Sequence, residues 1–281
     1  MPEPMLPLAF PSSLAVAAAL IGACVGSFLN VVAWRLPREE SLLRPGSHCP
    51  RCGHFLAWFE NLPVLGWLLL RGRCRHCHQP IAVRYPLLEL LTSGLFVAML
   101  PARPTGMGAA PDPWLLLFAG WLLVSWLLPL VLIDLDRLWL PEPLCRWGVV
   151  LGILVTALVG LLQDPLTARS LVLQHLLAAA AGLLGFEALS GLAQRIAGRP
   201  ALGLGDAKLA ALMGAWLGPL GLGVAVALAV FAGALIGGFA RLSGRLGPGQ
   251  PFPFGPFLAA ATLAVWIGGT GPWLALLGPG L

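Results

Sequence analysis

Long apolar runs separated by short turns dominate this 281-residue sequence. One of them extends from Trp114 to Ile133 without a single charged residue. About 20 apolar residues form a helix long enough to cross the hydrocarbon core of a bilayer. Because 58% of the residues are hydrophobic and only 10% are charged, a water-soluble core could not bury all the apolar surface. We therefore expect an all-α polytopic membrane protein.

We expect about eight transmembrane helices, two of which are short or interrupted by glycine and proline. They cover residues 14–34, 86–100, 114–133, 144–162, 171–189, 207–217, 220–240 and 257–277. The first run lacks a preceding basic segment and is too long for a cleaved signal peptide, so we interpret it as a retained helix. The expected division is a first helix (1–34), a cysteine-rich domain (35–85) and a second membrane domain (86–281).

The distribution of arginine and lysine predicts the orientation. Fifteen of the seventeen basic residues fall in alternate loops, and only Arg103 and Arg169 fall in the others. Since basic loops stay in the cytoplasm, we expect the loop 35–85, Asp134 and Asp206 on the cytoplasmic side and both termini outside. This topology accounts for the net charge of +5 without nucleic acid as a partner.

Four of the six cysteines form two C-x-x-C pairs in the loop after the first helix. They are Cys49, Cys52, Cys74 and Cys77, with twenty-one residues between the pairs. Two such pairs are typical of a zinc ribbon, in which four thiolates surround one Zn²⁺. The loop has little apolar material for a core, so a structural zinc would supply folding free energy. Redox-active thiols or a loop without metal are the alternatives.

Two acidic residues stand at predicted helix ends on the cytoplasmic side. Asp206 follows Gly203 and Gly205 at the start of an apolar helix, and Asp134 follows the unbroken run that ends at Ile133. Two carboxyl groups at one membrane depth can share a proton and act together as general base and general acid. Asp136 points away from Asp134 on a helix and reads as a solvated boundary residue. The alternative role for each acid is a hydrated charge at a helix end.

Several motifs, in this order, resemble those of the type IV prepilin peptidase family. They are residues 26–32 (GSFLNVV), the paired C-x-x-C loop with 61–67 (NLPVLGW), 84–92 (RYPLLELLT), 133–136 (IDLD), 203–208 (GLGDAK) and 253–257 (PFGPF). The resemblance covers nearly the whole chain and implies an intramembrane aspartic peptidase of the Gly-x-Gly-Asp type. Two departures from the usual family pattern, Glu142 for aspartate and Glu60 for aspartate, concern substrate fit more than catalysis.

The resemblance assigns roles to individual residues. It makes Asp206 and Asp134 the catalytic pair, with Gly203, Gly205, Lys208 and Glu89 as candidate substrate- or cofactor-binding residues. A snorkelling lysine and a buried, hydrogen-bonded acid are the structural alternatives for Lys208 and Glu89. The implied substrates are prepilins and type II secretion pseudopilins, whose short basic leader is removed at the inner membrane. N-methylation of the new terminus, with S-adenosylmethionine as donor, is implied in the same way.

Rival functions fit the residues less well. A transporter using intramembrane carboxylates as a proton relay predicts acids near the bilayer centre and an internal repeat, and we find neither. A thiol oxidoreductase would leave Asp134 and Asp206 without a role. The H-E-x-x-H motif of a metalloprotease is absent from the sequence. The sequence does not predict the oligomeric state.

Overall fold

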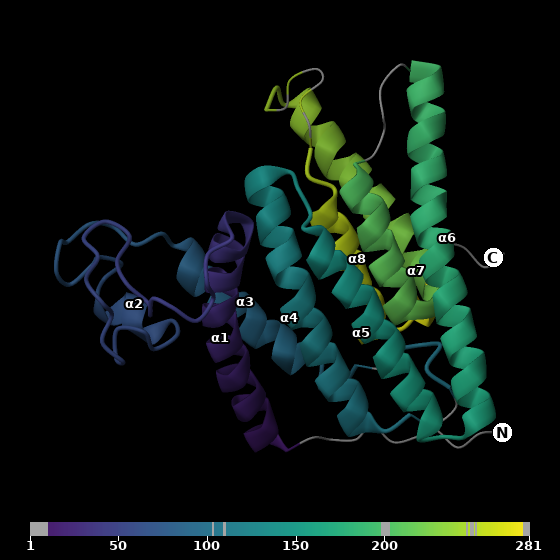
Figure 1. Cartoon of the computed structure of the whole chain (residues 1–281), viewed down its shortest axis with the longest axis horizontal. Helices are drawn as coiled ribbons and strands as arrows, with labels where there is room; N and C mark the ends of the chain where they lie inside the picture. Colours follow the sequence, from purple (N-terminus) through teal and green to yellow (C-terminus); the bar gives the residue numbers. More distant parts are fainter. Residues whose placement is uncertain are drawn as a thin grey trace. The chain divides into compact units, whose positions relative to one another are not determined.

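The computed structural model of this chain describes residues 11–102, 104–108, 111–197, 203–245, 247, 250 and 252–277. These residues fall into two compact units, Met1–Pro101 and Ala102–Leu281 (Figure 1). The predicted boundary after residue 85 lies within the first unit, in the first turn of its last helix, α3 (Arg84–Ala98). The predicted location of the termini concerns residues that lie outside the described part of the chain, at 1–10 and 278–281.

The expected all-α architecture is confirmed. The first unit contains α1 (Ser12–Arg35), the short 3₁₀ helix η1 (Leu36–Arg38), α2 (Leu65–Leu69) and α3 (Arg84–Ala98). The second unit contains α4 (Pro113–Arg137), α5 (Glu142–Leu161), α6 (Pro165–Ala197), α7 (Leu204–Leu242), α8 (Gly255–Gly268) and α9 (Gly271–Leu277). Across the described residues, the only β pairing outside helices is two isolated bridges in the cysteine-rich loop.

The expected eight spans are not confirmed. In the described residues, five helices are long and apolar enough to cross a membrane: Ser12–Arg38, Pro113–Arg137, Glu142–Leu161, Pro165–Ile196 and Leu204–Leu242. The helices α3 and α8 have only 15 and 14 residues, and the segments expected as the sixth and seventh spans form one kinked helix, α7. A short apolar helix needs neighbours or bilayer thinning to match the hydrocarbon thickness.

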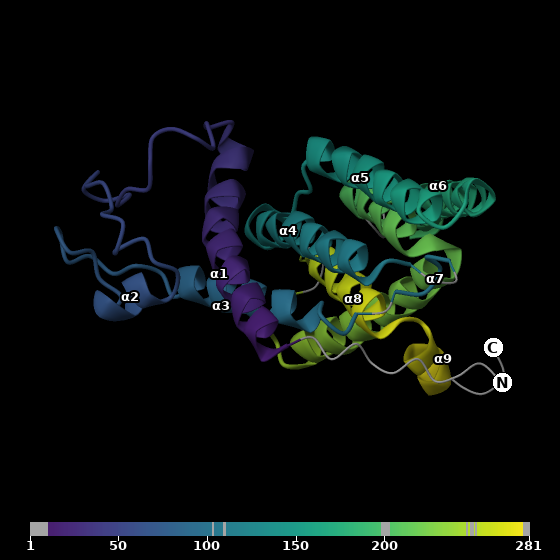
Figure 2. The same cartoon turned by 90° about the horizontal axis from the view of Figure 1, so that it is seen from below.

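In the first unit, α1 packs against α3 through glycine (Figure 2). A Cβ atom added to Gly22 would lie 2.8 Å from Ser93 Cα, and one added to Gly26 would lie 2.8 Å from Glu89 Cα. Larger residues would therefore force the two helices apart. Close backbone approach through small residues is the usual way in which helices associate within lipid.

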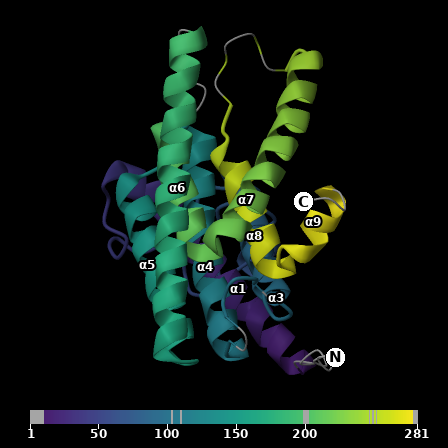
Figure 3. The same ribbon diagram turned by 90° about the vertical axis from the view of Figure 1, so that its right-hand side faces the viewer.

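In the second unit, α5, α6 and α7 run beside one another, and α8 packs on α7 (Figures 1 and 3). Glycines again set the contacts between α6 and α7, since a Cβ on Gly182 would lie 2.6 Å from the Ala210 carbonyl oxygen. Indole N–H groups join other helices: Trp126 donates to the Leu144 carbonyl oxygen over 2.8 Å and Trp216 to that of Gly148 over 2.9 Å. These bonds hold α5 against both α4 and α7.

The kink in α7 explains how one helix occupies two predicted segments. Gly218 has φ 68° and ψ −175°, and Pro219 follows it. Gly205 near one end of α7 packs on Leu140, and Gly233 on the second arm faces Phe254 at the start of α8. From Gly218 both arms therefore extend toward the side where α4 ends, so the chain reverses its direction at the kink.

A buried histidine completes the hydrogen bonding at this kink. In a continuous helix, the Ala215 carbonyl oxygen would accept from the N–H of residue 219, but proline has none. Instead, His175 Nδ1 lies 3.0 Å from that oxygen, and the histidine side chain is only 1% exposed. Thr156 Oγ1 lies 3.3 Å from the same nitrogen. This role could not be predicted from local sequence patterns, because His175 and Ala215 are forty positions apart in the chain.

Candidate functional site

Asp134 is a buried carboxylate at the end of α4. Its side chain is 6% exposed, because the apolar run before it continues into the helix core. Oδ2 of Asp134 accepts a hydrogen bond from the Gly255 N–H over 3.1 Å. The helix ends just beyond, where Leu138 adopts a left-handed φ of 53° and its N–H donates to the Asp134 carbonyl oxygen. The first turn of α8 thus lies directly on the carboxylate.

Asp206 lies in the first turn of α7 and is half-buried. Its Oδ2 accepts a hydrogen bond from the Gly203 N–H over 3.0 Å. Gly205 packs on Leu140, in the turn between α4 and α5, where an added Cβ would lie 3.0 Å from Leu140 Cβ. The two glycines therefore have different uses: one orients the carboxylate, and the other lets α7 approach the end of α4.

The structure brings the two predicted acids together. Asp206 is near enough to Asp134 for their charges to interact. Asp136, two residues further along α4, is exposed, as the helical spacing predicted. A pair of carboxyl groups in a partly buried position can hold one proton between them, so that one group acts as base while the other acts as acid.

Lys208 is occupied by an ion pair. Its Nζ lies 2.8 Å from Glu142 Oε2, which joins the second turn of α7 to the first turn of α5. The two side chains are 36% and 64% exposed, so solvent screens their charges and the pair contributes little to stability. Glu142, where the sequence departs from the family pattern, thus retains a negative charge that pairs with Lys208, two residues after Asp206.

Glu89 belongs to the first unit and is a buried acceptor. Its side chain is 7% exposed, and Oε2 accepts the Val64 N–H over 2.6 Å. Ser27 also hydrogen-bonds to this carboxylate. The contact ties α3 to the cysteine-rich loop and to α1, as expected for a buried, hydrogen-bonded acid. A substrate- or cofactor-binding role for Glu89 is not needed to explain these contacts.

The four loop cysteines converge. All four sulfur atoms lie within 4.8 Å of one another, with 3.8 Å between Cys49 and Cys77 and 4.0 Å between Cys52 and Cys74. A tetrahedron of thiolates with Zn–S bonds of about 2.3 Å has S–S edges of about 3.8 Å. The cluster is therefore spaced to bind a metal ion, and it is the one His/Cys/Asp/Glu group in the described residues that could hold one.

Each C-x-x-C pair lies in a tight turn, here called a knuckle: the first covers residues 48–55 and the second covers residues 73–80. The two knuckles repeat the same backbone pattern. In the first, the Cys49 N–H donates to the His54 carbonyl oxygen and the Gly53 N–H donates back to that of Cys49. In the second, Cys74 pairs in the same way with Gln79 and His78. Gly53 and His78 both have positive φ, at 71° and 56°. This local repeat was not found from the sequence, because its two copies share little beyond the cysteines.

The thiols of the cluster do not ionise alike. Burial raises the pKa of Cys49, but hydrogen bonds from the backbone of Cys52 and Arg51 outweigh it and lower that pKa to about 7. For Cys52, a backbone hydrogen bond involving His54 lowers the pKa, yet burial and the neighbouring sulfurs raise it to about 12. Four adjacent thiolates repel one another, so all four can be charged only when a cation lies among them. A bound metal ion would supply that cation.

Sequence reasoning missed the role of Gly255. Its motif, residues 253–257, was recognised. Because every residue except proline has a backbone N–H, the residue type does not indicate which N–H binds a carboxylate. A Cβ atom on Gly255 would lie only 2.6 Å from Asp134 Oδ2, so no side chain fits at this position without displacing the carboxylate. The glycine is therefore explained by its approach to Asp134.

Two family models match successive parts of the chain. The bacterial peptidase A24 N-terminal domain matches residues 20–102, and the type IV leader peptidase family matches residues 121–238. The prepilin leader peptidase/N-methyltransferase of Myxococcus xanthus is 43% identical over 244 residues, covering 86% of this chain and 68% of the relative. The chain belongs to the type IV leader peptidase family.

Other relatives agree with this membership of the type IV leader peptidases. The type 4 prepilin-like proteins leader peptide-processing enzyme of Escherichia coli O78:H11 is 34% identical, covering 91% of this chain and 94% of that protein. The prepilin leader peptidase/N-methyltransferase of Neisseria gonorrhoeae is 32% identical, covering 92% of each chain. No solved structure matches the chain significantly.

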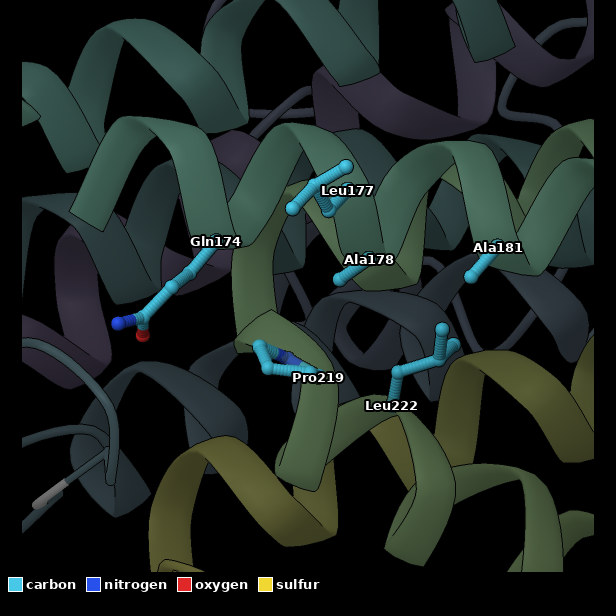
Figure 4. Close-up of a pocket in the computed structure, with 6 residues that line it drawn as sticks. All are labelled: Gln174, Leu177, Ala178, Ala181, Pro219 and Leu222. Carbon is cyan, nitrogen blue, oxygen red and sulfur yellow. The ribbon is translucent and has the colours of Figure 1, made fainter. Parts of the chain in front are cut away.

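One hollow of this leader peptidase family member lies in the second unit, away from the acids. It has a volume of about 290 Å³ and is lined by α6 and by the kink of α7 (Figure 4). Gln174 is its only polar side chain, and Pro219 forms one wall. Pro219 is thirteen residues beyond Asp206, a rise of about 20 Å along a helix. The hollow contains none of the predicted catalytic, metal or cofactor residues.

Proposed function

We propose that this membrane protein is an aspartic peptidase that removes the leader from type IV prepilins and type II secretion pseudopilins. Asp134 and Asp206 are the proposed catalytic pair. The observation that carries the proposal is their convergence at one end of the helical bundle, with one carboxylate held by Gly255 and the other by Gly203. Membership of a peptidase family favours this chemistry over a transporter's proton relay.

The pair would act on a water molecule between the two side chains. The charged carboxylate takes a proton from water as the oxygen attacks the scissile carbonyl, and the protonated carboxyl donates its proton toward the leaving amine. The N–H groups of Gly255 and Gly203 fix one oxygen of each acid, which leaves the other oxygen for the reaction. Cleavage should fail at low pH, because a doubly protonated pair has no base.

The position of the pair suits a substrate with a basic leader and an apolar helix. The acids stand at helix ends, so the leader would remain in water while the helix lies in lipid. The relatives are named for prepilins, and we extend that substrate class to this chain. We place the protein in the inner membrane, with the cysteine-rich loop and the catalytic pair facing the cytoplasm.

A labelling experiment tests this orientation. Leu43 in the cysteine-rich loop is 86% exposed, and Leu166 in the first turn of α6 is 79% exposed. A membrane-impermeant thiol reagent should modify Leu43→Cys only after the membrane is opened, whereas Leu166→Cys should react in intact cells. The reverse pattern would place the catalytic pair outside the cytoplasm.

We further propose that the protein methylates the terminus that cleavage creates. The methyl group passes from the sulfonium of S-adenosylmethionine to the amine nitrogen, the sulfonium becomes a neutral thioether, and the amine releases one proton. The names of several relatives support this second activity. The four thiolates of the loop would hold structural zinc, which stabilises the fold of the cysteine-rich region.

Incubation of purified protein with a prepilin peptide tests both activities. Leader release is followed by mass, and methyl incorporation is followed separately with labelled S-adenosylmethionine. The proposal predicts both products, with methylation only of the cleaved peptide. An intact peptide after incubation with folded, zinc-loaded protein would contradict the peptidase function.

A further inference from the structure

The first unit contains a hollow beside the thiol cluster. It has a volume of about 460 Å³ and is formed by both knuckles and by the segment between them. His54 and Phe55 come from the first knuckle, Glu60 from the segment between, and Arg75 and His76 from the second knuckle. Small-molecule sites have volumes of about 300–1,000 Å³. Nothing in the peptidase chemistry uses this hollow.

Glu60 on its wall has an unmatched carboxylate oxygen. The residue is only 7% exposed, and Oε2 accepts the Ala57 N–H over 2.8 Å. Oε1 is buried and has no hydrogen-bond partner among the described residues. A buried carboxylate oxygen without a donor is costly, and such groups in native structures usually have a partner. Because Glu60 lines the hollow, an ammonium group there would supply the missing donor once the carboxylate turns toward it.

The hollow also offers a positive charge. Arg75 lines it, with the guanidinium 5.4 Å from the centre of the Phe59 ring. Guanidinium groups match carboxylates in shape and hydrogen bonding. A carboxylate and a guanidinium in one hollow are complementary to a zwitterionic α-amino acid. A lysine or arginine of a basic leader would find Arg75 repulsive, so it fits less well.

Flat aromatic surfaces complete the hollow. The rings of His54 and His76 are stacked, with centres 5.1 Å apart and planes 18° apart. Phe55 is 63% exposed, so the face of its ring is open to a ligand. Purine bases stack on such faces. The hollow therefore has charged groups that could bind an amino acid and aromatic rings on which a nucleobase could stack.

We propose that this hollow binds S-adenosylmethionine, with its amino-acid end on Glu60 and Arg75 and its adenine on the aromatic wall. The inference rests on the methyl transfer proposed above. Because the stacked His54 and His76 come from different knuckles, the hollow keeps its shape only while the thiol cluster holds the knuckles together. Loss of metal should therefore abolish binding of the methyl donor as well as loosen the loop.

Calorimetry on the zinc-loaded, full-length protein in detergent micelles tests the proposal. The probes are S-adenosylhomocysteine and 5′-methylthioadenosine, which share the nucleoside but differ in the amino-acid end. Glutamine keeps an acceptor for Ala57 but loses the charge, so Glu60→Gln should weaken S-adenosylhomocysteine binding about tenfold and leave 5′-methylthioadenosine binding unchanged. Arg75→Ala should act in the same way.

Several outcomes would overturn the proposal. Wild-type affinity for S-adenosylhomocysteine in both variants would show that the hollow is not the site. Equal loss for both probes would show that Glu60 only maintains the loop, and weaker binding of the cleaved pilin peptide alone would assign the hollow to its ammonium terminus. Glu40→Gln, an exposed acid in the same unit, is the matched control. If the wild-type protein neither binds the probe nor transfers methyl, the proposed methyltransferase function itself fails.

Discussion

The Gly255 N–H and Asp134 Oδ2 are 3.1 Å apart, which joins the start of α8 to the end of α4 by one hydrogen bond. The two residues are 121 positions apart in the chain. The bond fixes one oxygen of a buried acid whose neighbour across the site is Asp206. Only proline would remove this backbone donor, whereas any other residue would fill the space beside it.

Gly255→Ala should impair catalysis without unfolding the protein. The new Cβ would lie 2.6 Å from Asp134 Oδ2, so the carboxylate or the helix must move. A displacement of about 1 Å at a catalytic group can cost about 10²-fold in rate. We expect leader cleavage to fall by about that factor, as measured with a prepilin peptide.

Gly223→Ala is the matched control for this substitution. A Cβ at that position on α7 meets no atom within 4 Å, so cleavage should be unchanged. Full activity of Gly255→Ala, with Asp134 still buried, would show that the close approach has no catalytic importance.

The Lys208–Glu142 ion pair predicts coupled effects of substitution. If Lys208 acts only through Glu142, then Lys208→Gln and Glu142→Gln should lower cleavage to the same modest extent, and the double variant should be no worse. The pair is largely exposed, so the thermal unfolding of these variants should differ little from that of the wild-type protein. A much larger loss with Lys208→Gln alone would indicate that the lysine contacts the substrate directly.

His175→Ala should destabilise the kink of α7. The substitution leaves the Ala215 carbonyl oxygen buried without a donor, which costs about 1–3 kcal/mol. His175→Asn should restore part of the loss, because the asparagine amide nitrogen can occupy the place of Nδ1. Thermal unfolding in detergent measures both effects. Equal stability of the alanine variant and the wild-type protein would mean that water or lipid satisfies the carbonyl oxygen.

The thiol cluster predicts a metal-dependent loop. Purified protein should contain about one zinc per chain, and Cys49→Ser or Cys74→Ser should lose it and become protease-sensitive between residues 49 and 77. Methylation should suffer more than cleavage, since the catalytic acids lie in the other unit. Metal analysis and limited proteolysis test this; a metal-free protein with an ordered, resistant loop would refute the structural role.

The features that could be predicted from the sequence are those that depend on local residue spacing. The apolar runs predicted helices, the C-x-x-C spacing predicted a cluster of four sulfurs, and helical geometry separated buried Asp134 from exposed Asp136. Each of these features follows from residues close together in the chain.

The sequence was a poorer guide to long-range contacts. The expected span count was not confirmed, because Gly218 and Pro219 produce a kink within a single helix and because α3 and α8 are short. The Gly255 donor and the His175 bond were also missed. In both, a backbone group hydrogen-bonds to a residue many positions away in the chain. Composition and periodicity do not predict such long-range contacts.

The central claim is that Asp134 and Asp206 act as one catalytic unit. Asparagine preserves the size of each side chain but removes the ionisable proton, so Asp134→Asn and Asp206→Asn should each lower cleavage by about 10²–10⁴-fold. The double variant should lose no more than either single variant, since the groups work together. Asp136→Asn, on the exposed side of α4, should retain most activity.

The most direct test is the rate of leader release from a prepilin peptide by these four purified variants and the wild-type protein, all shown to be folded. The account predicts near-complete loss for Asp134→Asn, Asp206→Asn and the double variant, with activity retained by Asp136→Asn. Normal leader release by Asp134→Asn or Asp206→Asn, or its loss with Asp136→Asn alone, would contradict the assignment of the catalytic pair.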